Sequence, residues 1–281
     1  MDTGPHPRPL SRAQGSFIRQ LLREKQVRST EGVFVVEGAK PCYDLISQHP
    51  QAIQSLLVSP RYLRTETDGD RSRRSSLGAR QFVCSDPAFE KLTDVEMPQG
   101  ILAVVRQPQW NEAQVLGRSR VLGIYGDHLQ DPANVGTIIR TAAALNLSGV
   151  WLSHDSADHF SPKVVRATAG TLLRLPVFRT ADLQAVRLSE CRIYSAVLSS
   201  ADKVPIREIQ TIPSRLLVAV GNEGAGLSSE IMKASQVRFS IPLAEGVESL
   251  NVAATVAISA FYFSGLPTDS GVHQEKSPPS A

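Results

Sequence analysis

Short apolar runs alternate with amphipathic segments along the chain, and this alternation predicts a series of strands and helices. Between two apolar runs of the first part, the polar segment 64–76 is expected to be an exposed loop. The other elements expected in this part are strands at residues 33–36, 53–59, 80–85 and 100–106 and helices at residues 17–25, 43–47 and 86–92. Together they make a small α/β unit of about ninety residues.

Five longer apolar runs follow in the second part, and each is expected to be a strand with a helix after it. The runs are "VLGIYGD" at residues 121–127, "GVWLS" at 149–153, "RIYSAVL" at 192–198, "LLVAVG" at 216–221 and "VRFSIPL" at 237–243. Near-continuous apolar runs are typical of strands buried on both faces. The second part is therefore expected to be a largely parallel sheet with helices on both sides.

Composition divides the chain into five segments. Residues 1–13 and 266–281 contain too few apolar residues to hold one conformation, so they are expected to be a disordered arm and a disordered tail. Between them we expect two α/β domains, at residues 14–107 and 120–265, joined by a Pro-containing linker at residues 108–119.

Charge and cysteine content exclude some classes of protein. The formal net charge of +3 over 281 residues is compatible with a polyanionic partner but does not identify one. Three well separated cysteines indicate neither a disulfide framework nor a thiolate zinc site. No secretory signal or membrane-spanning run is evident, so a cytoplasmic location without membrane association is expected. The acid-poor start leaves a transit peptide, and hence the mitochondrial matrix, as the alternative.

Polar residues gather where three of the predicted strands end. After the first of these strands, Asp131 can cap a helix that contains Asn134 and Arg140. The simple interpretation of the last two residues is a capping amide and a solvated charge. After the last strand, Ser249 and Asn251 precede a helix that is otherwise apolar or small. Such loops lie along one edge of a parallel sheet, where ligands usually bind.

A glycine-rich turn follows the strand at residues 216–221. The order of Gly221, Gly224 and Gly226 is GxxGxG, which does not match the dinucleotide fingerprint GxGxxG. Glu223 lies inside the turn and would repel a phosphate. A cofactor with little negative charge is therefore expected, and the alternative is an ordinary tight strand-to-helix turn.

Three segments of the chain resemble, in their order and spacing, the three motifs of the SpoU/TrmH family of RNA ribose 2′-O-methyltransferases, within the SPOUT superfamily. The segments are "DPANVGTIIRTAAALN", "VGNEGAGLS" and "IPLAEGVESLNVAATVAI". The resemblance is strong over residues 120–263. Residues 15–106 resemble more loosely the N-terminal RNA substrate-binding domain of family members, of which "VFVVEGAK" at residues 33–40 is the recognisable start.

The resemblance implies the fold and the cofactor. The expected fold is an α/β domain whose parallel sheet ends in a C-terminal trefoil knot, preceded by a small α/β substrate-binding domain. The expected cofactor is S-adenosyl-L-methionine. By motif position, the cofactor-binding residues are Gly221, Asn222, Gly226, Ile241 and Leu250.

The resemblance also implies the catalytic residues, which are Asn134, Arg140, Glu223, Ser249 and Asn251 by motif position. A methyl group on a sulfonium is already activated, so the protein has to align a ribose hydroxyl with it and help the proton leave, without a metal. Arg140 serves either as an unusual proton acceptor or as a clamp on the adjacent phosphate. Because a guanidinium is hard to deprotonate, we favour the clamp.

The partners implied by the resemblance are RNA and a second copy of the chain. Ribosomal RNA of the 23S type is preferred over transfer RNA because the extra N-terminal domain resembles the rRNA-modifying branch. A homodimer through the knotted domain is expected. Arg19, Arg23, Lys25 and Arg28 offer phosphate contacts, and an ordinary solvated helix face is an equal alternative for them.

Three other interpretations stay open. The segment "SHDSADHF" at residues 153–160 contains possible metal ligands, although a polar loop after a strand is preferred. A catalytically silent RNA-binding protein would have the same fold. A nucleotide-dependent oxidoreductase would also use a parallel sheet, but it needs a phosphate cradle that Glu223 opposes.

Overall fold

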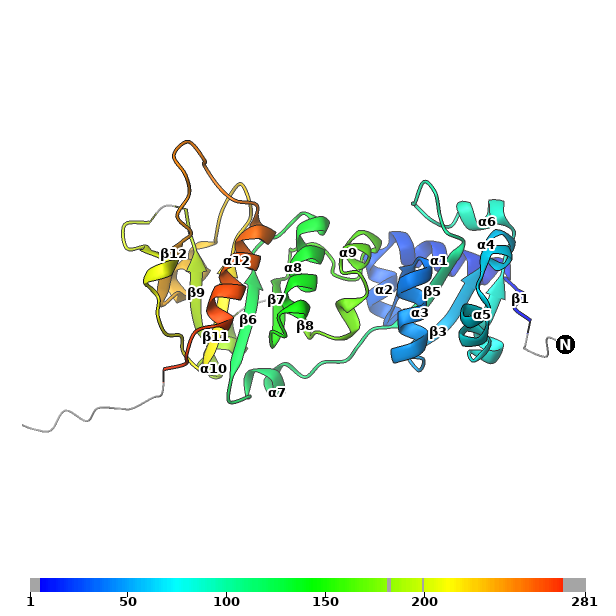
Figure 1. The fold of residues 1–281 in the computed structure, drawn as a ribbon, viewed down its shortest axis with the longest axis horizontal. Helices are drawn as coiled ribbons and strands as arrows, with labels where there is room; N and C mark the ends of the chain where they lie inside the picture. Colours follow the sequence, from blue (N-terminus) through cyan, green and yellow to red (C-terminus); the bar gives the residue numbers. More distant parts are fainter. Residues whose placement is uncertain (1–5, 181–182, 199, 270–281) are drawn as a thin grey trace, which may run out of the picture.

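The apolar runs form two separate sheets, each with helices packed against it, and the two units lie end to end along the molecule (Figure 1). This computed structural model describes residues 6–180, 183–198 and 200–269. In these ranges, no helix combines the length and the apolar character that crossing a lipid bilayer requires.

The first unit is a five-stranded mixed sheet in the order β1-β4-β3-β5-β2. β5 is antiparallel to both of its neighbours, whereas β1, β4 and β3 are parallel to one another. Its elements are β1 (Arg8–Pro9), α1 (Arg12–Arg23), α2 (Lys25–Glu31), β2 (Val33–Glu37), α3 (Ala39–Gln48), β3 (Ile53–Val58), α4 (Pro60–Thr65), α5 (Asp68–Ser75), η1 (Gly78–Arg80), β4 (Gln81–Val83), α6 (Asp86–Glu90) and β5 (Ile101–Arg106).

The predicted loop at residues 64–76 is wrong, whereas the predicted exposure holds for most of the segment. Most of this segment is helix α5, which begins after Thr67, whose side chain accepts a hydrogen bond from the backbone of Asp70. The helix carries Arg74 into the interior, where its guanidinium binds the buried carboxylate of Glu66 at 2.7 and 2.9 Å. The two buried charges of this segment, Glu66 and Arg74, neutralise each other inside the unit, while most of its other residues are exposed.

The predicted disordered ends are too long. Residues 8 and 9 pair with β4, and Ser11 caps α1 in a reciprocal capping box with Gln14, so most of the segment 6–13 is ordered. At the other end, Thr268 forms a parallel bridge with Ile212. Residues 1–5 and 270–281 lie outside the described residues.

The second unit is a seven-stranded sheet in the order β10-β12-β9-β11-β6-β7-β8, and every pairing in it is parallel, which confirms the predicted architecture. Its elements are α7 (Glu112–Leu116), β6 (Val121–Gly126), α8 (Pro132–Ala144), β7 (Gly149–Ser153), α9 (Pro162–Ala167), η2 (Thr171–Leu173), β8 (Val177–Thr180), α10 (Gln184–Leu188), β9 (Arg192–Ala196), β10 (Val204–Pro205), η3 (Ile206–Glu208), β11 (Arg215–Val220), α11 (Ser229–Ala234), β12 (Val237–Ser240) and α12 (Val252–Ser264).

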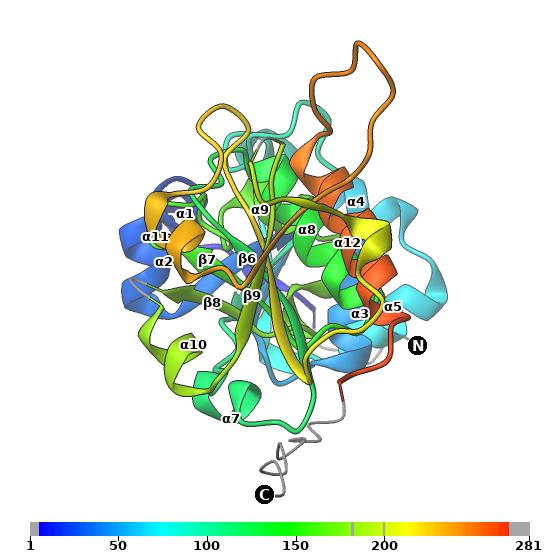
Figure 2. The same cartoon turned by 90° about the vertical axis from the view of Figure 1, so that its left-hand side faces the viewer.

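Both faces of this sheet are buried. Alternate residues of β11 belong to two different apolar clusters: Leu216 and Val218 pack on the side of α8 and α12, while Leu217 and Ala219 pack on the opposite side. Figure 2 shows α8 and α12 together on one side of the sheet and α10 and α11 on the other. The helix expected after β9 is absent from the described residues, since only the single turn η3 occurs there.

The two units share a continuous apolar contact. Helix α9 of the second unit packs against β2 of the first, and the rings of Phe34 and Phe160 lie 4.9 Å apart between centroids. The predicted linker contributes to the second unit, because Val115 and Leu116 of α7 are buried in its core.

Candidate functional site

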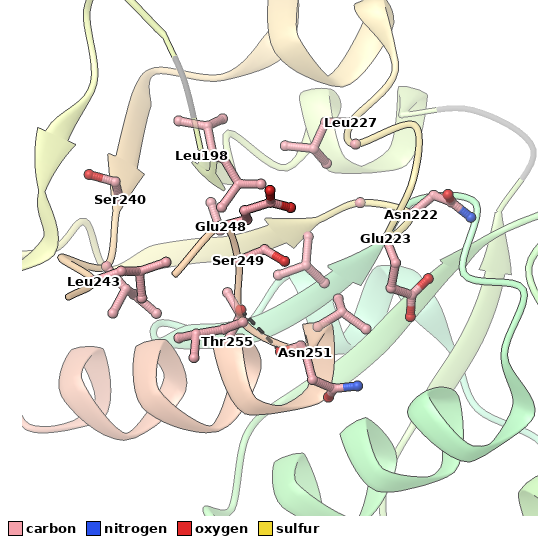
Figure 3. A pocket seen from close by; sticks show the side chains of 18 of the residues that line it. Leu198, Asn222, Glu223, Leu227, Ser240, Leu243, Glu248, Ser249, Asn251 and Thr255 are labelled. Atoms are coloured by element: carbon pink, nitrogen blue, oxygen red, sulfur yellow. Dashed lines mark hydrogen bonds between the residues drawn. The ribbon is translucent and has the colours of Figure 1, made fainter. Parts of the chain in front are cut away.

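A cavity of about 720 Å³ opens where β9, β11 and β12 end. Figure 3 shows that its walls come from loops that are far apart in the sequence. The lining segments are residues 196–198, 220–227, 239–243 and 247–252, with single residues at 203, 232 and 255. The parallel arrangement of the strands explains the convergence, because their carboxyl ends all meet at this edge of the sheet.

The glycine loop forms a closed turn against the cavity. Asn222 and Gly226 exchange backbone hydrogen bonds of 3.0 and 2.8 Å. A side chain at Gly221 would collide with the backbone of Gly226 and would lie 2.5 Å from the nitrogen of Leu227. Gly226 has a φ of 72°, in the left-handed region that favours glycine. The turn therefore requires glycine at both of its ends.

The side chain of Asn222 holds this turn in place. Its Oδ1 accepts hydrogen bonds from the backbone nitrogens of Gly224 at 2.9 Å and Ala225 at 3.1 Å. Its Nδ2 donates at 3.1 Å to the carbonyl of His128, at the end of the neighbouring strand β6. A single amide thus fixes both the shape of the turn and its position beside β6.

Asn251 explains the polar start of the apolar helix α12. Its Oδ1 caps the helix by accepting hydrogen bonds from Ala253 and Ala254 at 2.9 and 3.3 Å. The cap leaves its Nδ2 free to donate at 3.0 Å to Oδ1 of Asn134. One side chain therefore both begins the helix and reaches a second loop.

Asn134 lies between two of the loops and is only 9% exposed. Its Nδ2 donates to the carboxylate of Glu223, while its Oδ1 accepts from Asn251. In Figure 3 the side chains of Glu223 and Asn251 extend to the same side of the cavity. We call Asn134, Glu223 and Asn251 the amide cluster; it joins the loops after β6, β11 and β12.

The structure gathers most of the residues that the sequence singled out. The cavity lining includes seven of them besides Asn251, namely Gly221, Asn222, Glu223, Gly226, Ile241, Ser249 and Leu250. Asn134 contacts the cavity residues Glu223 and Asn251 from α8.

Arg140 is the exception. It lies on the exposed side of α8 and does not line the cavity. The helix buries Ile138, Ile139 and Ala142 against the sheet, so residue 140 faces outward. Within the described ranges it makes no hydrogen bond or ion pair. One copy of the chain therefore does not bring Arg140 to the cavity.

Sequence reasoning missed Asp127, a carboxylate that is only 2% exposed at the end of β6. Its Oδ2 accepts a hydrogen bond of 2.7 Å from the backbone of Ser228, and its Oδ1 lies 2.7 Å from Nδ1 of His128. It thus attaches the end of the glycine loop to β6. The acid that ends the run "VLGIYGD" was the available signal.

The carboxylates of the predicted polar loop after β7 contact side chains of other segments. Asp155 lies 3.1 Å from Nε2 of His128, and Asp158 lies 2.6 Å from the guanidinium of Arg28. Across the described part of the chain, no group of three or more His, Cys, Asp and Glu residues is placed to hold a metal ion.

Comparison with known protein families matches both units. Residues 122–261 match the family described as the SpoU rRNA methylase family, and residues 17–103 match the MRM3-like substrate binding domain. The first match contains all three loops of the cavity. The chain belongs to the SpoU rRNA methylase family.

Relatives extend the likeness to nearly the whole chain. The 23S rRNA (guanosine(2553)-2'-O)-methyltransferase RlmP of Bacillus subtilis is 31% identical over 250 residues, which is 87% of this chain and 93% of that protein. The human protein named rRNA methyltransferase 3, mitochondrial, is 24% identical over 88% of this chain and 70% of its own length.

This SpoU family member is also similar to a solved structure of a relative with its cofactor bound. The SpoU methyltransferase AviRb from Streptomyces viridochromogenes, in complex with the cofactor AdoMet, superposes with a TM-score of 0.78 at 25% identity, over 90% of this chain and 97% of that one. The predicted α/β fold and family are thereby confirmed.

Proposed function

We propose that this protein transfers a methyl group from S-adenosyl-L-methionine to a ribose 2′-hydroxyl of 23S-type ribosomal RNA. The observation that carries the proposal is that two of the motif loops line one cavity and that Asn134 of the third motif is hydrogen-bonded to both of them. The relative named as a 23S rRNA 2'-O-methyltransferase, together with the AdoMet complex, supports the reaction and the cofactor.

The cavity suits the proposed cofactor. Its volume of about 720 Å³ lies within the range of small-molecule sites, and it combines apolar walls with a closed glycine turn. Gly221, Ile241 and Leu250 all line it. S-adenosylmethionine supplies a methyl carbon activated by a positive sulfonium, and Glu223 and Glu248 place negative charge on the cavity wall.

The amide cluster orients the site. Asn134 is held from both sides, by Glu223 and by Asn251, so its position is fixed before any RNA binds. Such preorganised polar groups align a nucleophile without reorganisation cost at the moment of reaction. Ser249 is exposed beside them and adds a hydroxyl toward the incoming ribose.

Arg140 completes the site across a homodimer in this proposal. It carries an unpaired guanidinium on the outer side of α8, and α12 packs against α8. On α12, Phe261 is 72% exposed and Ile258 is 42% exposed, which provides an apolar face for a second copy. Arg140 then clamps the phosphate next to the ribose in the cavity of the partner, which is the role that suits a group that keeps its proton.

The remaining assignments follow the same scheme. Arg19, Arg23 and Lys25 lie exposed on and after α1 and offer phosphate contacts, whereas Arg28 is buried and does not. We place the domains at residues 14–107 and 120–265, and the trefoil knot in the second. A bacterial-type cytoplasmic location is favoured, with the mitochondrial matrix as the alternative that the human relative supports.

The function is tested by calorimetry with S-adenosylmethionine and by mapping 2′-O-methyl groups in ribosomal RNA from cells with and without the gene. We expect binding of the cofactor and the loss of one ribosomal methyl group. Cofactor binding without any lost methyl group in ribosomal or transfer RNA would contradict the proposal. Absence of cofactor binding would favour a silent RNA-binding protein instead.

The role of Arg140 is tested with Arg140→Lys and with Phe261→Ser. We expect Arg140→Lys to lower turnover at unchanged cofactor affinity, because a single ammonium replaces the planar fork. Phe261→Ser is expected to shift the protein toward monomer in analytical ultracentrifugation, with turnover falling in parallel. A fully active monomer would contradict the shared site.

A further inference from the structure

The contact between the two units contains a buried ion pair. Arg28 of the first unit and Asp158 of the second have side chains that are only 5% and 12% exposed. Nε and Nη2 of Arg28 both donate to Oδ2 of Asp158, at 2.9 and 2.6 Å. Nη1 donates at 2.7 Å to the carbonyl of Leu21, at the end of α1. The guanidinium is thus bonded to both units at once.

Asp158 also accepts hydrogen bonds within the second unit. Its Oδ1 accepts a hydrogen bond of 3.0 Å from the backbone of Phe160, and its carbonyl accepts one of 2.9 Å from Ser161. These bonds shape the turn that leads into α9. The ring of Phe160 packs against Phe34 of the first unit and lies 4.1 Å from the ring of His159.

Helix α9 carries this contact to the amide cluster. α9 packs against β2 of the first unit on one side and against α8 on the other. The approach to α8 is so close that a side chain at Gly136 would collide with Ala167 and lie 2.9 Å from the carbonyl of Val164. Gly136 is less than one turn from Asn134 on the same helix.

We propose that Arg28 and Asp158 are positioning residues for the RNA, holding the substrate-binding unit at a fixed place relative to α8 and the methyl-transfer cavity. The inference rests on the proposed function, because it assumes that one RNA contacts both units. A ribose then reaches the cavity only when the rest of the RNA fits the fixed span between the units.

Two physical arguments support a fixed joint. Domains in one chain move relative to one another by default unless their interface is large and hydrophobic. Here the apolar contact of Phe34 with Phe160 is joined by the ion pair of Arg28 with Asp158. A buried ion pair adds little stability in comparison with an apolar pair, but its hydrogen bonds require one geometry. When the two units are held rigidly, RNA bound to one unit meets the site on the other at a high effective concentration. When the units move freely, that effective concentration falls and the RNA binds more weakly.

The main experiment uses Asp158→Asn in the full chain. Spin labels on Met97→Cys in the first unit and Leu188→Cys in the second, both strongly exposed positions, report the distance between the units. We expect a broadened distance distribution and a KM for a long rRNA fragment raised about tenfold. The KM for a short hairpin that spans only the cavity, and the Kd for S-adenosylmethionine, stay within twofold of the parent values.

Two further variants exclude trivial outcomes. Asp68→Asn removes an acid of α5 whose side chain is 98% exposed, in the same acid-to-amide manner, and is expected to change none of these values. If Asp158→Asn does not fold, Arg28→Met with Asp158→Leu replaces the ion pair by an apolar pair, which usually preserves stability. This double variant is also expected to broaden the distances and raise the KM for the long RNA.

An unchanged distance distribution in the folded variants would overturn the proposal. An equal rise in KM for both RNAs would overturn it as well, because loss of a joint affects only RNA that contacts both units. Failure of the proposed function is recognised separately, since the parent chain would then methylate neither RNA while the distance measurement would still give its result.

Discussion

The two units bury polar side chains in different ways, and the difference separates stability from function. In the first unit, Glu66 receives two hydrogen bonds from Arg74 and one of 2.7 Å from the hydroxyl of Tyr43. Arg74 also donates at 2.6 Å to Gln81, so the network is satisfied and closed from solvent. Such a network holds a polar segment in place.

In the second unit, the amide cluster lies at the side of an open cavity. Glu223 is exposed, and Asn251 is exposed although it bonds both a helix end and Asn134. These groups keep hydrogen-bonding capacity for a ligand. The comparison shows that a polar side chain is a functional candidate where it retains hydrogen-bonding capacity and a structural one where all its hydrogen bonds are internal.

The strongest test of the comparison is Gly221→Ala. We expect it to abolish measurable binding of S-adenosylmethionine, because the new methyl group would meet the backbone of Gly226 and Leu227, which cannot move aside as a side chain could. Calorimetry measures the affinity. Gly224→Ala is the matched control, since its added carbon meets only Oδ1 of Asn222 at 3.5 Å. Equal affinities of the two variants for S-adenosylmethionine would show that the close contact of Gly221 with the backbone of Gly226 does not matter for binding.

The next effect concerns the first unit. Glu66→Gln leaves the buried guanidinium of Arg74 without a counter-charge, so we expect a loss of about 3–5 kcal/mol in the free energy of unfolding. Urea unfolding measures it, and cofactor affinity should stay unchanged. Asp68→Asn, at a fully solvated partner of Arg71, should leave the urea midpoint unchanged. If Glu66→Gln lowered cofactor affinity without lowering stability, the purely structural role of this network would be wrong.

A pH effect is expected at the joint between the two units. Burial lowers the pKa of His159 to about 4, below its ordinary value near 6.5. The folded state therefore favours the neutral ring. Its contribution to stability is complete above about pH 6.5 and is lost as the pH falls toward 4, by up to about 3 kcal/mol.

Urea unfolding between pH 4 and pH 7 tests this effect, with His159→Gln as the variant that removes it. We expect a flatter pH dependence in His159→Gln than in the parent chain. His154→Gln changes an exposed ring five positions earlier and should keep the parental profile. Parallel curves for the parent and His159→Gln would show that the buried ring does not titrate as described.

The smallest expected effect concerns Asn251, which both caps α12 and donates a hydrogen bond to Asn134. Asn251→Ser keeps a capping oxygen for α12 but removes the amide that donates to Asn134. We expect turnover to fall about tenfold, equivalent to about 1.4 kcal/mol, at constant cofactor affinity. Asn251→Ala should in addition cost about 1 kcal/mol of stability through the lost cap. Full turnover in the Ser variant would reduce Asn251 to a helix cap.

The sequence was sufficient to predict strands where the apolar runs were long. The five main strands of the second unit were all predicted, and their parallel arrangement followed from their length and the helices between them. The short strands β8 and β10 were missed because Val177–Thr180 and Val204–Pro205 bury too little to produce a pattern. Segment 64–76 was misjudged because its charges pair through folding, which periodicity does not record.

The site was predictable in type more than in geometry. The polar residues of the three loops stood out because they interrupt apolar runs, whereas Ile241 and Leu250 could be named only from the resemblance to the family motifs. The bond from Asn251 to Asn134 joins residues 117 positions apart and depends on where β6 and β12 end, which no local pattern encodes. Arg140 shows the same limit, because the helix face it occupies is set by which side of α8 packs on the sheet.

The short strand β1 has a practical consequence for anyone who shortens the chain. Arg8 and Pro9 cover the outer edge of β4, and the guanidinium of Arg8 stacks 5.1 Å above the ring of Phe82. Deletion of the first eleven residues would uncover that edge as a ladder of unpaired amides, ready to join the same edge of another molecule. Preparations that begin at α1 are therefore expected to aggregate, although every catalytic residue named above is still present.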